Sequence, residues 1–271
     1  MPAGCQRLVS CISDLQQWCA SRPLQLNASK TELIWLGSRV ALQKLSANDS
    51  SLVVGTTTIQ PSNVVRNLGV LFDNELTFKQ HVSKIVSSCF YQLRRLRQLK
   101  CHVDVNTMKL LISAFILSRL DYCNVLLSGL PMSTIRPLQR VQNAAARPAL
   151  GLSPRDHVSA ALQKLHSSTL AIPVTTHRIQ YKLALMMFLV HSHQCPDYMS
   201  NIVSLVSDDP GRRRLRSATS TDYHVPRTRT TFGDRAFSVA GPKAWNNLPQ
   251  SVRSADSLDS FMRKLKIFVS F

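Results

Sequence analysis

The stretch Val64–Lys100 decides the fold of this chain: VVRNLGVLFDNELTFKQHVSKIVSSCFYQLRRLRQLK. Its first part opens with Val64-Val65 and passes through Asn67, Leu68 and Gly69 into the apolar run 70–72, which predicts a short buried strand with a bulge or a close backbone approach at Gly69. Further along, the apolar residues follow the spacing of an amphipathic helix: Phe78, Val82, Ile85, Val86, Cys89, Phe90, Leu93 and Leu96. Asp73 and Asn74 lie between the two parts and carry side chains that cap helices. We therefore predict a strand that leads directly into a long helix.

The predicted helix ends in a cluster of positive charge: Arg94, Arg95, Arg97 and Lys100. The three arginines have no acidic residue three or four positions away, although a solvated helix face normally carries such partners. Two interpretations remain open. The cluster is either a solvated face or a surface that follows a nucleic-acid backbone, and the missing acidic partners favour binding.

Segments before this stretch favour strands, and segments after it favour helices. Before it we expect a helix at 6–21, a strand at 33–36, a loop at 38–50 and a hairpin of 52–54 with 57–59. After it we expect helices at 104–127, 133–147, 156–166, 175–194 and from Leu258 to the end. The second of these begins with Ser133 as its cap and is expected to break at Pro148. The predicted fold class is α+β, mostly α.

Charge is the most informative feature of the composition. The 271 residues carry a formal net charge of +18, with an ordinary hydrophobic content of 44%. The excess is +3 in residues 1–72, +7 in 73–150 and +8 in 151–271. A surface this basic favours an anionic partner, of which a nucleic-acid backbone is the commonest and a membrane surface a weaker alternative.

Neither a leader nor a membrane span is expected. The chain begins with Met1-Pro2-Ala3-Gly4-Cys5, which lacks the basic start and apolar core of a signal peptide. The longest apolar stretch, residues 110–130, carries Arg119 and Asp121 near its middle, which indicates a buried helix rather than a span. We therefore expect an intracellular protein, in the nucleus or the cytoplasm, with no membrane partner.

Further candidate nucleic-acid-binding residues lie outside the basic helix that ends near Lys100. Arg136 and Arg140 fall on the outward face of the helix that follows Ser133. The polar, basic segment 207–231 holds the densest positive run: Arg212, Arg213, Arg214 and Arg216. This run could bind RNA, act as a nuclear address or be a flexible loop.

No catalytic or metal site is predicted. The one Asp pair, Asp208-Asp209, precedes Pro210-Gly211 and has the composition of a turn. The chain holds only two glutamates, and no Gly-rich phosphate loop is present. Trp245, in a segment rich in Pro and Asn, is interpreted as a packed anchor, with a base-stacking platform as the alternative.

Six segments of the chain together resemble the reverse transcriptase of LINE-type non-LTR retrotransposons, specifically the jockey and chicken-repeat group. They occur in the order of that family and cover nearly the whole chain: LQLNASKTELIWLG (24–37), VRNLGVLFDNELTFKQHVSKI (65–85), LISAFILSRLDYCNVLLSGLP (111–131), LQRVQNAAAR (138–147), HRIQYKLALMMFLV (177–190) and FGDRAFSVAGPKAWNNLP (232–249).

The resemblance implies a division into three parts. Residues 1–75 would be a palm remnant with a primer-grip-like hairpin, 76–150 a helical thumb, and 151–271 a C-terminal extension that contains the basic loop 207–231. Lys30 would lie near the incoming nucleotide, although a solvated turn residue is the alternative. The thumb would contact RNA or an RNA–DNA duplex.

The chain also departs from the family. The catalytic strand-turn-strand, an aromatic residue followed by Ala-Asp-Asp, would precede residue 1 and is not in this sequence. Residues 166–173 and Pro148 differ from the family pattern and suggest a decayed or shifted copy.

The resemblance therefore implies a C-terminal fragment of an RNA-directed DNA polymerase that binds nucleic acid. The fragment would be inactive by itself, because it lacks the catalytic carboxylates. It would also bind no cofactor, whereas the full-length family uses Mg²⁺. The alternative is a helical protein-interaction module or a non-functional remnant of a mobile element.

Overall fold

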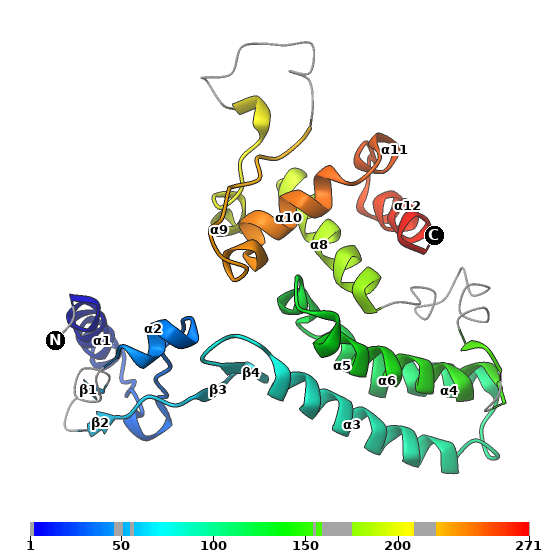
Figure 1. The fold of residues 1–271 in the computed structure, drawn as a ribbon, viewed down its shortest axis with the longest axis horizontal. Helices are drawn as coiled ribbons and strands as arrows, with labels where there is room; N and C mark the ends of the chain where they lie inside the picture. Colours follow the sequence, from blue (N-terminus) through cyan, green and yellow to red (C-terminus); the bar gives the residue numbers. More distant parts are fainter. Residues whose placement is uncertain are drawn as a thin grey trace. The chain divides into compact units, whose positions relative to one another are not determined.

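A computed structural model describes residues 3–45, 51–54, 57–153, 156–158, 175–208 and 221–270 (Figure 1). Helix accounts for 60% of the structure and strand for 8%, and the strands form two antiparallel hairpins. The fold is thus α+β and mostly α, which confirms the predicted class. Internal contacts divide the chain into two compact units, Met1–His81 and Val82–Phe271. The predicted boundaries at 75 and 150, which the resemblance suggested, stay predictions.

The described part of the first unit includes two short sheets, two α-helices and a 3₁₀ turn at Ala28–Lys30. Its elements are α1 (Ala3–Ala20), α2 (Arg39–Gln43), β1 (Leu52–Val54), β2 (Thr57–Ile59), β3 (Val64–Asn67) and β4 (Val70–Asp73). β1 pairs with β2, which confirms the predicted hairpin, and α1 packs against β1. The core consists of Leu33, Leu52, Val54 and Ile59, with Leu8, Val9, Ile12, Leu26 and Trp35 packed against it.

The predicted single strand at 64–72 is wrong, because this segment is a hairpin. β3 pairs with β4 in a register that sets Asn67 opposite Val70, so that Leu68 and Gly69 form a two-residue turn. Both turn residues have positive φ, 45° at Leu68 and 87° at Gly69. This is the turn class whose backbone twist matches that of antiparallel strands.

Two further predictions in the first unit are wrong. Residues 33–36 form no strand, since only Leu33 makes an isolated bridge, to Pro61. The expected loop 38–50 contains the short helix α2, whose start is stabilised by the Ser38 hydroxyl as it accepts from the Ala41 N–H at 3.3 Å.

Asp73 links β4 to the long helix α3 (Lys79–Gln98), as the sequence predicted. Its carboxylate accepts from the backbone N–H groups of Thr77 and Phe78, each at 2.7 Å. These bonds satisfy donors in the segment that enters α3. The strand-to-helix junction is therefore held by a side chain that belongs to the strand.

The second unit is helical (Figure 1). After α3 it contains α4 (Val105–Ile112), α5 (Ser118–Asp121), α6 (Met132–Leu150), α8 (Thr175–His191), α9 (Asp197–Ser200), α10 (Phe237–Asn246), α11 (Gln250–Arg253) and α12 (Leu258–Ser270). α4 packs against α6, and α8 packs against α6, α10 and α12. The helix predicted at 156–166 lies largely outside the described residues.

Several predicted helix boundaries in this unit are wrong. The helix expected at 104–127 begins after Asp104, as predicted, and passes through a π-helical turn at Ser113–Leu117, but it ends at Asp121. It ends there because Tyr122 is extended and Cys123 adopts φ 51°. α6 is not broken by Pro148; it begins at Met132 and continues to Leu150, where Gly151 adopts a left-handed conformation.

The core at the C-terminal end of the chain forms where α8 meets α10 and α12. Trp245 and Phe261 are fully buried there, and Phe188 stacks on Phe261 with ring centroids 4.2 Å apart. The indole N–H of Trp245 donates to the Thr221 carbonyl at 2.9 Å. Trp245 is therefore a packed anchor, as predicted, and its burial rules out the alternative of a base-stacking platform.

Among the helices of the described ranges, none combines the length and the apolar composition that crossing a membrane would require.

Candidate nucleic-acid interface

The helix α3 has one buried face and one basic face. Cys89, Leu93 and Leu96 are buried, whereas all four cations predicted from the sequence are exposed. Arg94, Arg95 and Arg97 lie in the last turns of the helix, and Lys100 follows its end. The structure therefore presents this group to solvent, as binding to an anionic ligand would require.

An exposed aromatic ring supports one of these arginines. Tyr91 and Arg95 are one turn apart on α3, with the guanidinium 5.8 Å from the ring centroid and Nη1 3.5 Å from the phenol oxygen. This contact orients the guanidinium without neutralising it. The ring itself is half exposed, so that the pair offers both a cation and a stacking surface.

Arg119, which the sequence reasoning did not select, adds a cation beside α3. It lies on α5, and its Nη1 donates to the Ser88 hydroxyl on α3 at 3.1 Å. Burial raises the pKa of the neighbouring Cys89 thiol to about 11, with Arg119 acting in the opposite direction. The thiol is thus protonated at neutral pH, and the charge at this position belongs to Arg119. The sequence offered one signal for this role, since Arg119 is a basic residue within the apolar stretch 110–130.

The acidic residues of this part of the chain are engaged elsewhere. Residues 82–153, all of which the structure describes, contain two carboxylates, Asp104 and Asp121. Asp104 accepts from the backbone N–H groups of Asn106 at 3.0 Å and Thr107 at 3.3 Å. Hydrogen bonds to Thr107 and Asn106 lower the pKa of Asp104. Asp121 forms an ion pair with Arg178, so within the described ranges no ion pair neutralises the cations of α3.

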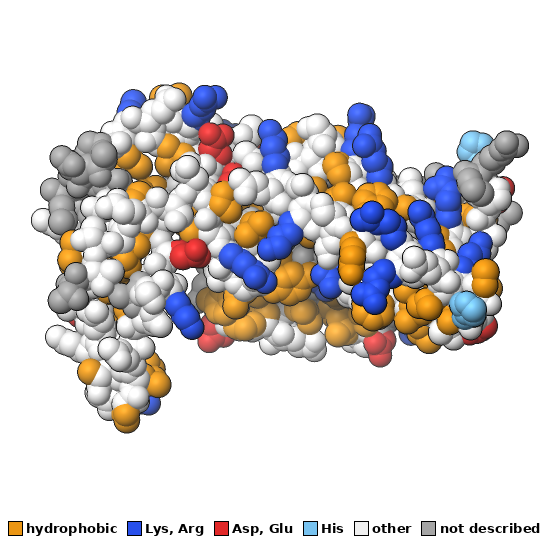
Figure 2. Space-filling view, turned by 90° about the horizontal axis from the view of Figure 1, so that it is seen from below, with side chains coloured by type: hydrophobic (Ala, Val, Ile, Leu, Met, Phe, Trp, Pro, Cys, Tyr) orange, Lys and Arg blue, Asp and Glu red, His pale blue; other side chains and the backbone are white. Residues whose placement is uncertain are grey.

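α6 contributes the next cations. Arg136 and Arg140 are exposed, whereas Ile135 and Leu138 on the opposite face of the helix are buried, as predicted. Figure 2 shows a face of the molecule on which Lys and Arg side chains gather among apolar ones, with few acidic side chains between them. The surface of this part of the chain is thus positive over a wide area rather than at one point.

The remaining predicted residues belong to other parts of the chain. Lys30 is exposed at the end of a 3₁₀ turn, Ala28–Lys30, which Ser29 and Thr31 stabilise through bonds to Asn27. Its proximity to a nucleotide stays a prediction. The run Arg212, Arg213, Arg214 and Arg216 lies outside the described residues. In the part of the chain that is described, no three His, Cys, Asp or Glu residues form a group that could hold a metal ion.

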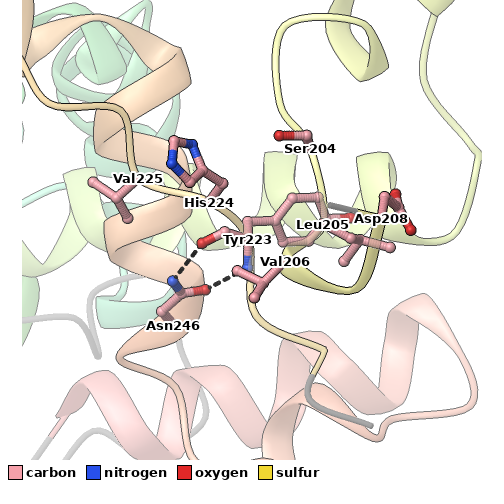
Figure 3. A pocket seen from close by; sticks show the side chains of 8 residues that line it. All are labelled: Ser204, Leu205, Val206, Asp208, Tyr223, His224, Val225 and Asn246. Atoms are coloured by element: carbon pink, nitrogen blue, oxygen red, sulfur yellow. Dashed lines mark hydrogen bonds between the residues drawn. The ribbon is translucent and has the colours of Figure 1, made fainter. Parts of the chain in front are cut away.

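A pocket of about 590 Å³, lined by both polar and apolar side chains, lies around Tyr223 (Figure 3). One wall is the segment around Tyr223, whose backbone N–H and carbonyl pair with the side-chain amide of Asn246 at 2.9 and 2.8 Å. The Asn246 side chain thereby accepts one backbone hydrogen bond and donates another, as a neighbouring strand would, and holds this segment against α10. The sequence reasoning missed this role because the two residues are 23 positions apart.

No family model, curated protein or solved structure matches the chain. The resemblance to reverse transcriptases rests on the six quoted segments.

Proposed function

We propose that residues 79–150 bind the sugar–phosphate backbone of RNA or of an RNA–DNA duplex, as part of a reverse-transcriptase-like protein. The observation that carries this proposal is the exposed, unneutralised group of cations at the end of α3. An RNA ligand would place the protein in the nucleus or the cytoplasm.

The side chains suit phosphate rather than base recognition. Arginine presents a planar fork of donors that matches phosphate oxygens. α3 extends over about 30 Å, given a rise of about 1.5 Å per residue, so a ligand that lay along it would meet several phosphates. Tyr91 could stack on an unpaired base, and such stacking tolerates any sequence. We therefore expect binding with little sequence preference.

The test is the salt dependence of binding. The ligand is a fluorescein-labelled RNA–DNA hybrid of about 20 base pairs, titrated with the purified chain and followed by anisotropy. If the protein engages six to ten phosphates, affinity should fall ~10³–10⁵-fold between about 50 and 200 mM salt. An affinity that does not change with salt would contradict backbone binding.

A further inference from the structure

A groove of about 760 Å³ opens in the second unit, and none of the cations of α3 lines it. Its walls come from four parts of the chain: α5 with the turn that follows it, α8, α9 and the start of α10. The lining is predominantly apolar and comprises Ser118, Asp121, Tyr122, Cys123, Asn124, Val125, Leu126, Lys182, Met186, Tyr198, Met199, Ile202 and Phe237.

The apolar side chains in this groove are accessible to solvent. Tyr198 is 70% exposed and Ile202 48% exposed, and Tyr122 and Leu126 are also exposed. All four line one groove and give it an exposed, mostly apolar lining, as sites that bind an apolar ligand surface have. Two methionines at the same site, Met186 and Met199, supply flexible side chains that adapt to different partners.

The polar residues of the groove define its charge. Asp121 is neutralised by its ion pair with Arg178. Lys182 is exposed, and none of the ion pairs within the described ranges involves it. The side-chain oxygen of Asn124 is buried and has no hydrogen-bond partner in the described structure, which is rare for a buried polar atom. The groove is thus an apolar surface with one cation and one unsatisfied acceptor.

We propose that this groove binds an acidic amphipathic helix of a partner protein. Apolar residues of the helix would fill the space beside Ile202, and a carboxylate on its flank would pair with Lys182. This is the arrangement in which an amphipathic helix places its apolar face in an apolar groove. Charge complementarity selects an acidic helix, since the chain carries +18.

Other occupants fit these observations less well. A second copy of the chain carries the same net charge of +18, which opposes self-association. A membrane surface would favour a protruding apolar patch, whereas this surface is hollow. A nucleic-acid strand would meet only one cation here, Lys182, among mostly apolar side chains.

The experiment selects helical ligands from a library whose side chains are not chosen in advance. A displayed library of helix-forming peptides is panned against the full chain, and the enriched peptides are synthesised with a fluorescein label. We expect bulky apolar residues at positions i, i+3 or i+4, and i+7, flanked by Asp or Glu. Ile202→Glu should weaken binding by about tenfold or more, because it places a charge in the apolar groove and repels the acidic flank.

Matched variants keep the test decisive. Leu110→Glu is the control, because Leu110 on α4 is 71% exposed and does not line the groove; it should leave binding within about twofold. Tyr198→Ala, which truncates an exposed side chain, should also weaken binding. Lys182→Glu should weaken it by about tenfold, and a peptide with Lys in place of Glu should restore it.

Four outcomes would overturn the proposal. The first is enrichment of no peptide, or of peptides without apolar spacing. The second is binding that Ile202→Glu and Leu110→Glu reduce equally. The third is a dimer in sedimentation equilibrium, or flotation with phosphatidylserine vesicles, that Ile202→Glu abolishes, since the groove would then be a self-contact or a membrane contact. The fourth is RNA binding that depends on Ile202.

Discussion

The guanidinium of Arg178 on α8 is buried and forms an ion pair with the carboxylate of Asp121 at the end of α5. The Nε atom of Arg178 donates to Oδ1 of Asp121 at 2.8 Å, and Nη2 donates to Oδ2. This pair joins the helices before residue 150 to those after it. Because Asp121 is paired with Arg178, one of the two carboxylates in residues 82–153 is not available to the cations of α3.

Asp121→Asn should therefore destabilise the second unit. Arg178 is only 5% exposed, so loss of the carboxylate leaves a buried charge without its counter-ion. We expect the free energy of unfolding to fall by about 2–3 kcal/mol, below the usual cost for fully buried pairs because Asp121 is 33% exposed.

The control for this prediction is Lys243→Gln. Lys243 and Asp234 form an ion pair at 3.5 Å in which both side chains are about half exposed, so the change should cost less than about 1 kcal/mol. Urea unfolding measures both variants. Equal effects would show that burial of Arg178 does not set the strength of the Asp121 pair.

The turn between β3 and β4 offers a second prediction. Leu68 has φ 45°, which a leucine adopts only at a cost, whereas asparagine before glycine is preferred in this turn. Leu68→Asn should stabilise the hairpin, because asparagine adopts a positive φ more readily than leucine, and Gly69→Ala, at φ 87°, should destabilise it by about 1–2 kcal/mol. Amide hydrogen exchange in β3 and β4 measures both. A stabilising Gly69→Ala would be inconsistent with the assigned turn.

The third prediction concerns pH. His191 contacts the Tyr223 hydroxyl at 3.2 Å and lies 5.0 Å from the Trp245 ring. Burial, followed by the charges of His193 and Arg253, lowers the pKa of His191 below its ordinary value of 6.5. The folded state therefore favours the neutral ring. The neutral His191 ring therefore stabilises the fold at a pH above the pKa that His191 has in the unfolded state. This stabilisation is lost as the pH falls through the pKa that His191 has in the folded state.

We expect the free energy of unfolding to decrease between about pH 7.5 and about pH 5, and His191→Asn to remove part of that decrease. Asparagine keeps a polar atom near the Nδ1 position but does not titrate. Urea unfolding at each pH, followed by near-ultraviolet circular dichroism, provides the measurement, with the exposed His102→Asn as the control. A larger effect from His102→Asn would refute the assignment to His191.

The sequence predicted α3 well because two signals agreed in it. The spacing of its apolar residues defined one face, and the position of Arg94, Arg95 and Arg97 defined the other. The hairpin at 64–73 was missed because a glycine between apolar residues fits a bulge within one strand as well as a turn between two strands. Leucine at position 68 gives no signal for a positive φ.

Local spacing could not predict contacts between distant residues. Arg119 reaches Ser88 across 31 positions, and Asn246 pairs with Tyr223 across 23. Each contact depends on how helices and segments pack in the second unit. The short helix α2 was missed for a different reason, since five residues offer too few apolar positions to define a period.

The central claim is that the cations of α3 bind a nucleic-acid backbone. The test compares the triple variant Arg94→Gln, Arg95→Gln, Arg97→Gln with a control of equal charge loss, Arg7→Gln, Arg263→Gln, Lys264→Gln. All six residues are exposed, so both variants should retain the stability of the unaltered chain. The controls lie on α1 and α12, outside the residues 79–150 to which binding is assigned.

Binding of both variants to the labelled RNA–DNA hybrid is measured across a salt series. If the cations of α3 contact phosphates, the α3 variant should lose affinity by about tenfold or more, and its salt dependence should fall by about one unit for each lost contact. The control variant should keep a slope close to that of the unaltered chain. Equal losses in the two variants, or no loss in the α3 variant, would contradict the assignment of binding to α3.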